Sequence, residues 1–177
     1  SNTAIGKVAL AANTTASNNT AVGSSALAAN TTGGGNSALG YRALQANTTG
    51  IRNIAVGQDS LYGNTEGNYN VAVGYSALQD NTTAANNNTA FGYAPLYENT
   101  TGANNTAFGH SALQKNTTGS MNVAVGSGAL ASVTTGEKNI GIGYRAGEAT
   151  TDAEDNVAVG QQALEENSTG NRNIAIG

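Results

Sequence analysis

Apolar and polar residues follow one pattern that repeats every 17 residues along the chain, with a single step of 18. Each unit opens with Asn-x-Ala-x-Gly, in which one Gly replaces the Ala, and the overlaid units read N-x-A-V-G-Y-x-A-L-x-x-N-T-T-G-x-x, numbered below as places one to seventeen. Place one is held by Asn2, Asn19, Asn36, Asn53, Asn70, Asn88, Asn105, Asn122, Asn139, Asn156 and Asn173. Place four is always large and apolar: Ile5, Val22, Leu39, Val56, Val73, Phe91, Phe108, Val125, Ile142, Val159 and Ile176. A period of this length is typical of a repeat protein.

Each unit predicts two short strands and two turns. Places two to four, such as residues 106–108, alternate and are rich in β-branched residues, as strands are. Places eight and nine, such as Ala112 and Leu113, predict a second short strand, while the Gly at place five and the Asn-Thr-Thr-Gly corner predict turns. The same residues disfavour helix. The predicted fold is therefore an all-β parallel β-roll, a β-solenoid of about ten 17-residue coils with two short strands per coil.

The coils must stack in order to fold. A composition rich in Asn, Thr and Gly favours disorder, but a disordered chain has no reason to keep a large apolar residue at one place of every unit. A lone coil buries too little apolar surface to offset its ordering entropy, whereas stacking pairs its backbone with the coils on either side. Ten steps of about 4.8 Å predict a rod about 48 Å long. We expect residues 1–177 to form one continuous β-roll domain, a fragment of a longer fibrous protein.

Several recurring residues have predicted structural roles. The Gly at place five predicts a positive φ or a close backbone approach. Asn at places one and twelve predicts two amide ladders along the rod, the second interrupted by Val133 and Thr150. Pro95 stands at place eight, which predicts that the N–H of this place is not needed between coils.

Place three holds nothing larger than Ala in any unit. Because place three faces the opposite side of the strand from places two and four, this restriction indicates that both faces of the strand are covered. Close packing of rolls side by side in a homo-oligomer explains it. The alternative is a thin roll whose own interior excludes larger groups.

Composition excludes several classes of protein. The net charge of −4 and the pI near 4.7 leave no basic surface for nucleic acid. There is no Cys, so the chain is not a disulfide-stapled domain. No apolar run is long enough for membrane insertion of this segment.

Little in the sequence points to catalysis or to a cofactor. His110, the only His, stands at place six, which otherwise holds Tyr or polar residues, and no Ser has a His and acid partner in a motif. Residues 33–35 are three Gly that no Lys follows, so they form no phosphate loop. The densest acidic group consists of Glu148, Asp152, Glu154 and Asp155. Its oxygen ligands could bind a hard cation, but it lacks a calcium-binding pattern, which favours a solvated loop with no metal site. We expect a chain that is not an enzyme and holds no cofactor.

Two sets of residues are candidates for contact with glycans. The Tyr residues of place six can stack on sugar rings or can lie over neighbouring coils as turn residues; they are Tyr41, Tyr75, Tyr93 and Tyr144. Sequons for N-glycosylation also recur, and in a glycosylating host their Asn residues would carry glycans. They begin at Asn13, Asn18, Asn30, Asn47, Asn81, Asn87, Asn99, Asn104, Asn116 and Asn167.

The units NTAFGHSALQKNTTG (105–119) and NVAVGYSALQDNTT (70–83) resemble the repeats of bacterial and phage tail-fibre-like proteins. They are similar, more distantly, to the left-handed β-roll heads of YadA-like trimeric autotransporter adhesins. The resemblance extends over all 177 residues. It implies a left-handed homotrimer of rolls in a fibre outside the cell, on a cell surface or as a virion appendage, with attachment to a cell-surface glycan or receptor as its role. The unit length differs from that of the adhesin heads, so their binding surfaces do not carry over.

The expected function is thus a structural and adhesive rod that spaces or presents a receptor-binding tip, with copies of itself as partners. One alternative is a glycosylated extracellular filament protein whose rolls stack end to end. Another is an ice-binding solenoid, against which the placement of the paired Thr in turns counts.

Overall fold

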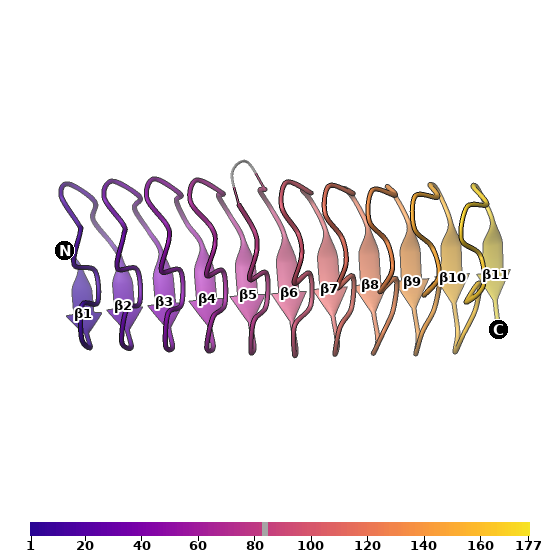
Figure 1. Ribbon diagram of the computed structural model, residues 1–177, viewed down its shortest axis with the longest axis horizontal. Helices are drawn as coiled ribbons and strands as arrows, with labels where there is room; N and C mark the ends of the chain where they lie inside the picture. The colour runs from indigo at the N-terminus through magenta and orange to yellow at the C-terminus, as the bar shows by residue number, and fades with distance from the viewer. Residues whose placement is uncertain (83–84) are drawn as a thin grey trace.

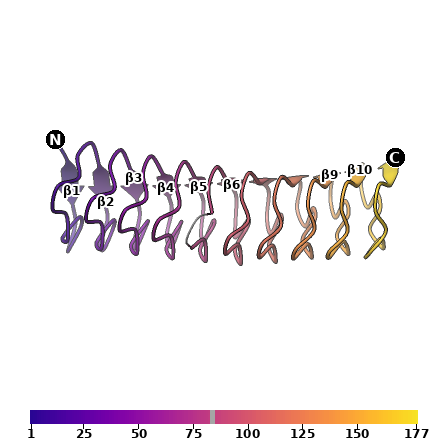
Figure 2. The same ribbon diagram turned by 90° about the horizontal axis from the view of Figure 1, so that it is seen from above.

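The computed structural model describes residues 1–82 and 85–177, and there the chain winds into a row of coils that share one 11-stranded sheet (Figure 1). Each coil contributes one strand of three residues at places two to four. The strands are β1 (Thr3–Ile5), β2 (Thr20–Val22), β3 (Ser37–Leu39), β4 (Ile54–Val56), β5 (Val71–Val73), β6 (Thr89–Phe91), β7 (Thr106–Phe108), β8 (Val123–Val125), β9 (Ile140–Ile142), β10 (Val157–Val159) and β11 (Ile174–Ile176). Figure 2 shows the strands along one side of the row and the connecting segments along the other.

The strands pair in sequence order, parallel and place for place. In β7 and β8, for example, Ala107 lies opposite Ala124 and Phe108 opposite Val125. The same register continues across the one step of 18 residues, where Ala72 pairs with Ala90. These observations confirm the parallel β-solenoid of about ten coils, and the described residues contain no helix.

The prediction of a second strand in each coil is wrong. Places seven and nine have positive φ, as at Ser111 (55°) and Leu113 (52°), so the segment is a series of turns. It still joins the coils, because the N–H of Leu113 donates to the carbonyl of Ala129 in the next coil at 3.0 Å. Leu rarely adopts this left-handed conformation, which costs roughly 1–2 kcal/mol per residue, and residue preferences therefore could not indicate it.

The interior of the roll lies between the strand and this turn segment. Ala107 of β7 and the pair Ala112 and Leu113 are fully buried in one core cluster. At Gly141, an added Cβ would stand 2.7 Å from Leu130 Cγ and 2.8 Å from the Ala146 carbonyl oxygen. Place three therefore faces the roll's own interior. The thin interior explains its small residues, which is the second of the two alternatives, so place three gives no support to an oligomer.

Asn at place one ties each coil to the next and also braces its own coil. The Oδ1 of Asn105 accepts the backbone N–H of Asn122 at 3.0 Å, and its Nδ2 donates to the Gly119 carbonyl at 2.8 Å. The predicted ladder at this place thus runs mainly from side chain to backbone. It holds the start of the strand in one coil to the Asn side chain of the preceding coil.

Asn at place twelve forms the predicted ladder between side chains. The Nδ2 of Asn99 donates to the Oδ1 of Asn81 at 2.9 Å, and that of Asn116 donates to the Oδ1 of Asn99 at 2.7 Å. The ladder ends where Val133 replaces Asn, which leaves the buried Oδ1 of Asn116 without a hydrogen-bond partner. A buried acceptor without a partner costs about 1–3 kcal/mol.

The Gly at place five has both features that the sequence predicted. Its φ lies between 124° and 146° in every coil. A Cβ on Gly109 would stand 2.6 Å from the carbonyl oxygen of Gly126, its counterpart in the next coil. Neighbouring backbones therefore approach here so closely that only Gly fits.

The prediction for Pro95 is also confirmed. In other coils the N–H of place eight bonds within its own coil, as Ala129 does to the Gly126 carbonyl at 3.3 Å. A Pro at this place consequently removes a weak turn hydrogen bond and leaves the contacts between coils intact.

Completing the place-twelve ladder should stabilise the roll. In the double variant Val133→Asn, Thr150→Asn, each new amide can donate to the Oδ1 before it, which satisfies Asn116 and continues the ladder to Asn167. We expect the free energy of unfolding, measured by urea denaturation, to rise by roughly 1–2 kcal/mol. The mirror variant Asn64→Val should lower it by a similar amount, because it removes the donor to Asn47 Oδ1. An unchanged stability in both variants would contradict the role of the ladder.

Substituting the Gly of place five should be severely destabilising. In Gly109→Ala the methyl group meets a backbone carbonyl that cannot move without separating two coils, so we expect a loss of at least about 3 kcal/mol in the same assay. The control is Gly35→Asn. Gly35 has a φ of 74° at place seventeen, where Asn104 already adopts 59°, and the change should cost little.

Candidate functional site

The outer surface of the sheet carries a row of exposed apolar side chains. Since place three points inward, places two and four point out. Phe108 is 39% exposed and Ile142 is 40% exposed, and the rings of Phe91 and Phe108 stack at 5.0 Å between centroids. The exposed apolar residues of these two places are Ile5, Leu39, Ile54, Phe91, Phe108, Val125, Ile142, Ile174 and Ile176. We call the surface formed by places two and four the sheet face.

The sheet face is long and narrow, and its place two carries Thr or Ser in five of the eleven strands. Ten steps of about 4.8 Å and a strand about 10 Å long give an area on the order of 480 Å². The largest apolar patches of monomeric proteins are of this size and often mark interaction sites. The alternation of the strand indicated that places two and four share one face, but it did not show that they, rather than place three, lie outside.

A second exposed feature is a rank of aromatic rings at place six. Tyr75 stacks on Tyr93, and Tyr93 stacks on His110, each pair with centroids 5.1 Å apart. Of the four Tyr residues proposed for glycan contact, the structure thus brings two together. Tyr41 lies instead beside the Arg42 guanidinium, 4.9 Å from its ring centroid, and Tyr144 lies two coils beyond His110.

The sequence puts His110 at place six, but we did not predict that its ring continues this rank. Its place in the repeat was the signal that could have found it, since place six puts it directly above Tyr93. Its ring stacks on Tyr93, and its backbone carbonyl accepts the N–H of Gly128 in the next coil at 3.0 Å. That the chain is not an enzyme stays a prediction.

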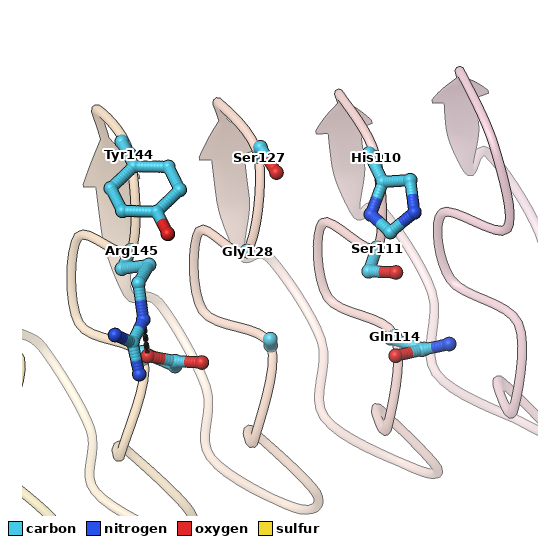
Figure 3. A pocket seen from close by; sticks show the side chains of 9 residues that line it. His110, Ser111, Gln114, Ser127, Gly128, Tyr144 and Arg145 are labelled. Carbon is cyan, nitrogen blue, oxygen red and sulfur yellow. Dashed lines mark hydrogen bonds and ion pairs between the residues drawn. The ribbon is translucent and has the colours of Figure 1, made fainter.

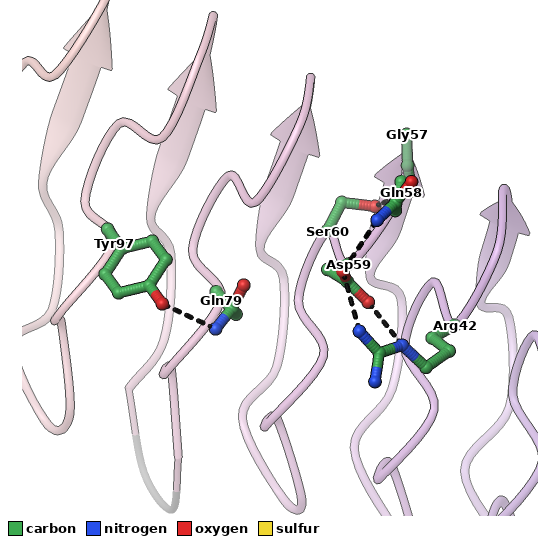
Figure 4. Close-up of polar contacts among 7 residues, drawn as sticks. All are labelled: Arg42, Gly57, Gln58, Asp59, Ser60, Gln79 and Tyr97. Carbon is green, nitrogen blue, oxygen red and sulfur yellow. Dashed lines mark hydrogen bonds and ion pairs between the residues drawn. The ribbon is translucent and has the colours of Figure 1, made fainter.

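Part of the same side of the roll is tied together by polar contacts (Figure 4). Arg42 donates from Nε and Nη2 to the two carboxylate oxygens of Asp59 at 2.7 and 2.9 Å, and its guanidinium also lies 4.9 Å from the Tyr62 ring. The hydrogen bond to Asp59 raises the pKa of Arg42 above its usual value. Farther along, the Nε2 of Gln79 donates to the Tyr97 hydroxyl at 2.9 Å. These groups join neighbouring coils, so their charges and donors are already in use.

The four acidic residues of the divergent unit do not converge on one point. Glu148 contacts Arg145, Asp152 accepts the Thr151 hydroxyl at 3.2 Å, and Asp155 lies 3.8 Å from Arg172. In the part of the chain that the structure describes, no three His, Asp or Glu side chains form a group that could hold a metal ion.

The sequons fall into two classes by burial. Asn30, Asn47, Asn81, Asn99 and Asn116 belong to the buried ladder, and Asn13 and Asn167, at the same place, are half-buried. Thr83, which completes the Asn81 sequon, lies outside the described residues. By contrast, Asn18, Asn87 and Asn104 are exposed at place seventeen. A glycan on a ladder Asn would occupy the amide nitrogen that holds two coils together.

The Thr hydroxyls of place thirteen are used within the roll. Thr100 Oγ1 donates to the Thr117 carbonyl at 2.9 Å, and Thr117 Oγ1 donates to the Thr134 carbonyl at 3.0 Å. This rank is therefore engaged between coils and does not present free hydroxyls to ice.

Comparison with protein-family models, with curated proteins and with solved structures finds no match to this chain. The residues from 1 to 82 and from 85 to 177 include no apolar helix of membrane-spanning length. The sheet face and the ring rank are the two exposed features on which a function can rest.

Glycosylation, if it occurs, should follow the burial of the sequons. In protein secreted from a glycosylating host, we expect glycans at Asn18, Asn87 and Asn104 and none at Asn30, Asn47, Asn99 or Asn116. Peptide mass spectrometry of the folded fraction measures the occupancy of each site. Full occupancy of the buried sites in folded protein would contradict the ladder.

Proposed function

We propose that the chain is a segment of a structural and adhesive fibre, in which three copies pack their sheet faces around a common axis. The observation that carries the proposal is the apolar sheet face. The large aliphatic and aromatic side chains at place four lie outside the roll, while its interior holds mostly Ala, Leu and Asn. A second copy of the chain offers the same long, narrow apolar surface and thus fits it along its whole length.

The narrowness of the sheet face favours three copies over two. Two faces of about 480 Å² each would bury about 960 Å², which is less than the roughly 1,200–2,000 Å² of stable specific interfaces. Around a three-fold axis each roll contacts two neighbours, so the residues that flank the strand are buried as well. The resemblance of the repeats to trimeric fibre proteins agrees with this number and implies a left-handed coil.

Parallel copies in register match the side chains of the sheet face by size. Phe91 and Phe108 are the only aromatic residues at place four. Three-fold symmetry places each Phe at the same height along the axis as the same Phe of the other two copies, so the large side chains meet one another.

A rod of this kind spaces or presents a receptor-binding tip. We place it outside the cell, on a bacterial surface or in a phage tail fibre, as the resemblance implies. The main competing arrangement is the end-to-end filament. It is less well supported, because it leaves the apolar sheet face in water. Ice binding is less well supported, since the Thr rank of place thirteen bonds between coils.

Adding charge to the sheet face should dissociate the trimer. We expect native mass spectrometry to give three chains for the unmodified protein and one chain for Phe108→Asp, Ile142→Asp, because burying a carboxylate at the axis is unfavourable. Circular dichroism of the same sample reports whether the monomer is still folded.

The control is Thr118→Asp, which adds charge at an exposed corner where Glu66 and Asp152 already occur. It should remain trimeric. A folded monomer for the unmodified chain, or a trimer that survives both charges on the sheet face, would contradict the proposal. Particles of indefinite mass would favour the filament.

A further inference from the structure

The ring rank of place six is interrupted by a slot at the coil of β8. His110 continues the stack of Tyr75 and Tyr93, but the next coil carries Ser127 and Gly128 at places six and seven, and the coil after it carries Tyr144. Figure 3 shows the rings of His110 and Tyr144 on either side of the small Ser127 side chain. The two rings therefore form the walls of a slot in which one ring of the rank is missing.

The slot is a pocket of about 230 Å³ that is open to solvent. His110 and Tyr144 stand two coils apart, which is about 10 Å. Adjacent rings of the rank lie 5.1 Å apart, so a six-membered ring placed midway would contact both walls. The volume lies below the roughly 300–1,000 Å³ of drug-sized sites. This volume fits a single ring with small substituents.

Polar groups line the rest of the slot. They are the side chains of Ser111, Gln114, Ser127, Arg145 and Glu148. Gly128 and Ala131 also line the slot, and their small size leaves it open. Hydroxyl, amide, guanidinium and carboxylate groups together can donate and accept hydrogen bonds around the edge of a ring. Two aromatic faces with a polar rim suit a ligand that is apolar on its faces and carries hydroxyls on its edge, as a pyranose does.

The charged side chains around the slot determine which ring ligands it favours. Arg145 is paired with Glu148 and also with Glu165, at 3.0 Å from Nη1 to Oε1. One guanidinium thus stands against two carboxylates, and the local excess of negative charge disfavours a sugar that carries a carboxylate.

We propose that this slot binds one neutral pyranose residue of a glycan, sandwiched between His110 and Tyr144. The site lies on the side of the rod, so attachment would not depend only on a tip. The inference rests on the proposed adhesive function for its purpose, and three copies in one fibre would add avidity to a weak single site. Sugar binding itself can be measured whether or not the chain is a trimer.

The test is to fill the slot with the chain's own ring. Ser127→Tyr supplies the missing member of the rank, and Tyr is already accepted at place six in four other coils.

The probes are the methyl pyranosides of glucose, galactose, mannose and N-acetylglucosamine at millimolar concentration, and their binding is measured by saturation-transfer NMR. We expect at least one of them to bind the unmodified chain and to lose binding in Ser127→Tyr. Removing one wall in Tyr144→Ala should weaken it by about three- to tenfold.

The matched control is Ser24→Tyr, the same substitution at place six of the second coil, which should bind as the unmodified chain does. Circular dichroism and native mass spectrometry of each sample show whether its folding or oligomeric state has changed. A loss of sugar binding is thereby distinguished from a loss of the trimer. Absence of binding by every neutral pyranoside, or equal binding by Ser127→Tyr, would overturn the proposal. It would also be overturned if only N-acetylneuraminic acid, or only an aromatic probe such as N-acetyltyrosinamide, bound in the slot.

Discussion

The hydrogen bonds between successive coils constrain every other feature of this structure. Backbone donors from all parts of a coil bond to its neighbours, as Gly109 does to the Phe91 carbonyl and Thr117 to the Thr134 carbonyl. Each coil must therefore repeat the backbone path of the one before, at the spacing of paired strands. This requirement keeps the repeat in phase and leaves no room for a side chain at the Gly of place five.

The same stacking turns repeated side chains into continuous ranks. Asn at place twelve, Phe at place four and the rings of place six each meet their counterparts one coil away. A single substitution therefore affects the residues at the same place in the two adjacent coils, as the unpartnered Oδ1 of Asn116 beside Val133 shows. The ladder holds coils together, while the exposed ranks are free to contact other molecules.

Much of this architecture could be predicted from the repeat. The strand of β8, the close approach at Gly109 and the ladder through Asn99 all follow from residues that recur in phase. The turn segment could not be predicted, because its left-handed Leu113 contradicts ordinary residue preferences.

The exposed surfaces were harder to predict than the fold. Alternation shows that places two and four share a face, but the inward face is decided by the turn segment that packs against Ala107. Consequently the large residues, normally assigned to a core, lie outside. The slot beside Ser127 depends on absent side chains in one coil and on rings in the coils that flank it, so it emerges only when the coils are stacked.

The central claim is that copies of the chain meet through the sheet face, in register. The sequence has no Cys, so a single Val125→Cys on β8 provides an unambiguous probe of this contact. On mild oxidation, the account predicts rapid disulfide formation between copies, because symmetry brings the same place together at the axis. Thr118→Cys, at the outer corner, should remain reduced under the same conditions. If the two variants form disulfides equally slowly on a non-reducing gel, the sheet face is not the interface.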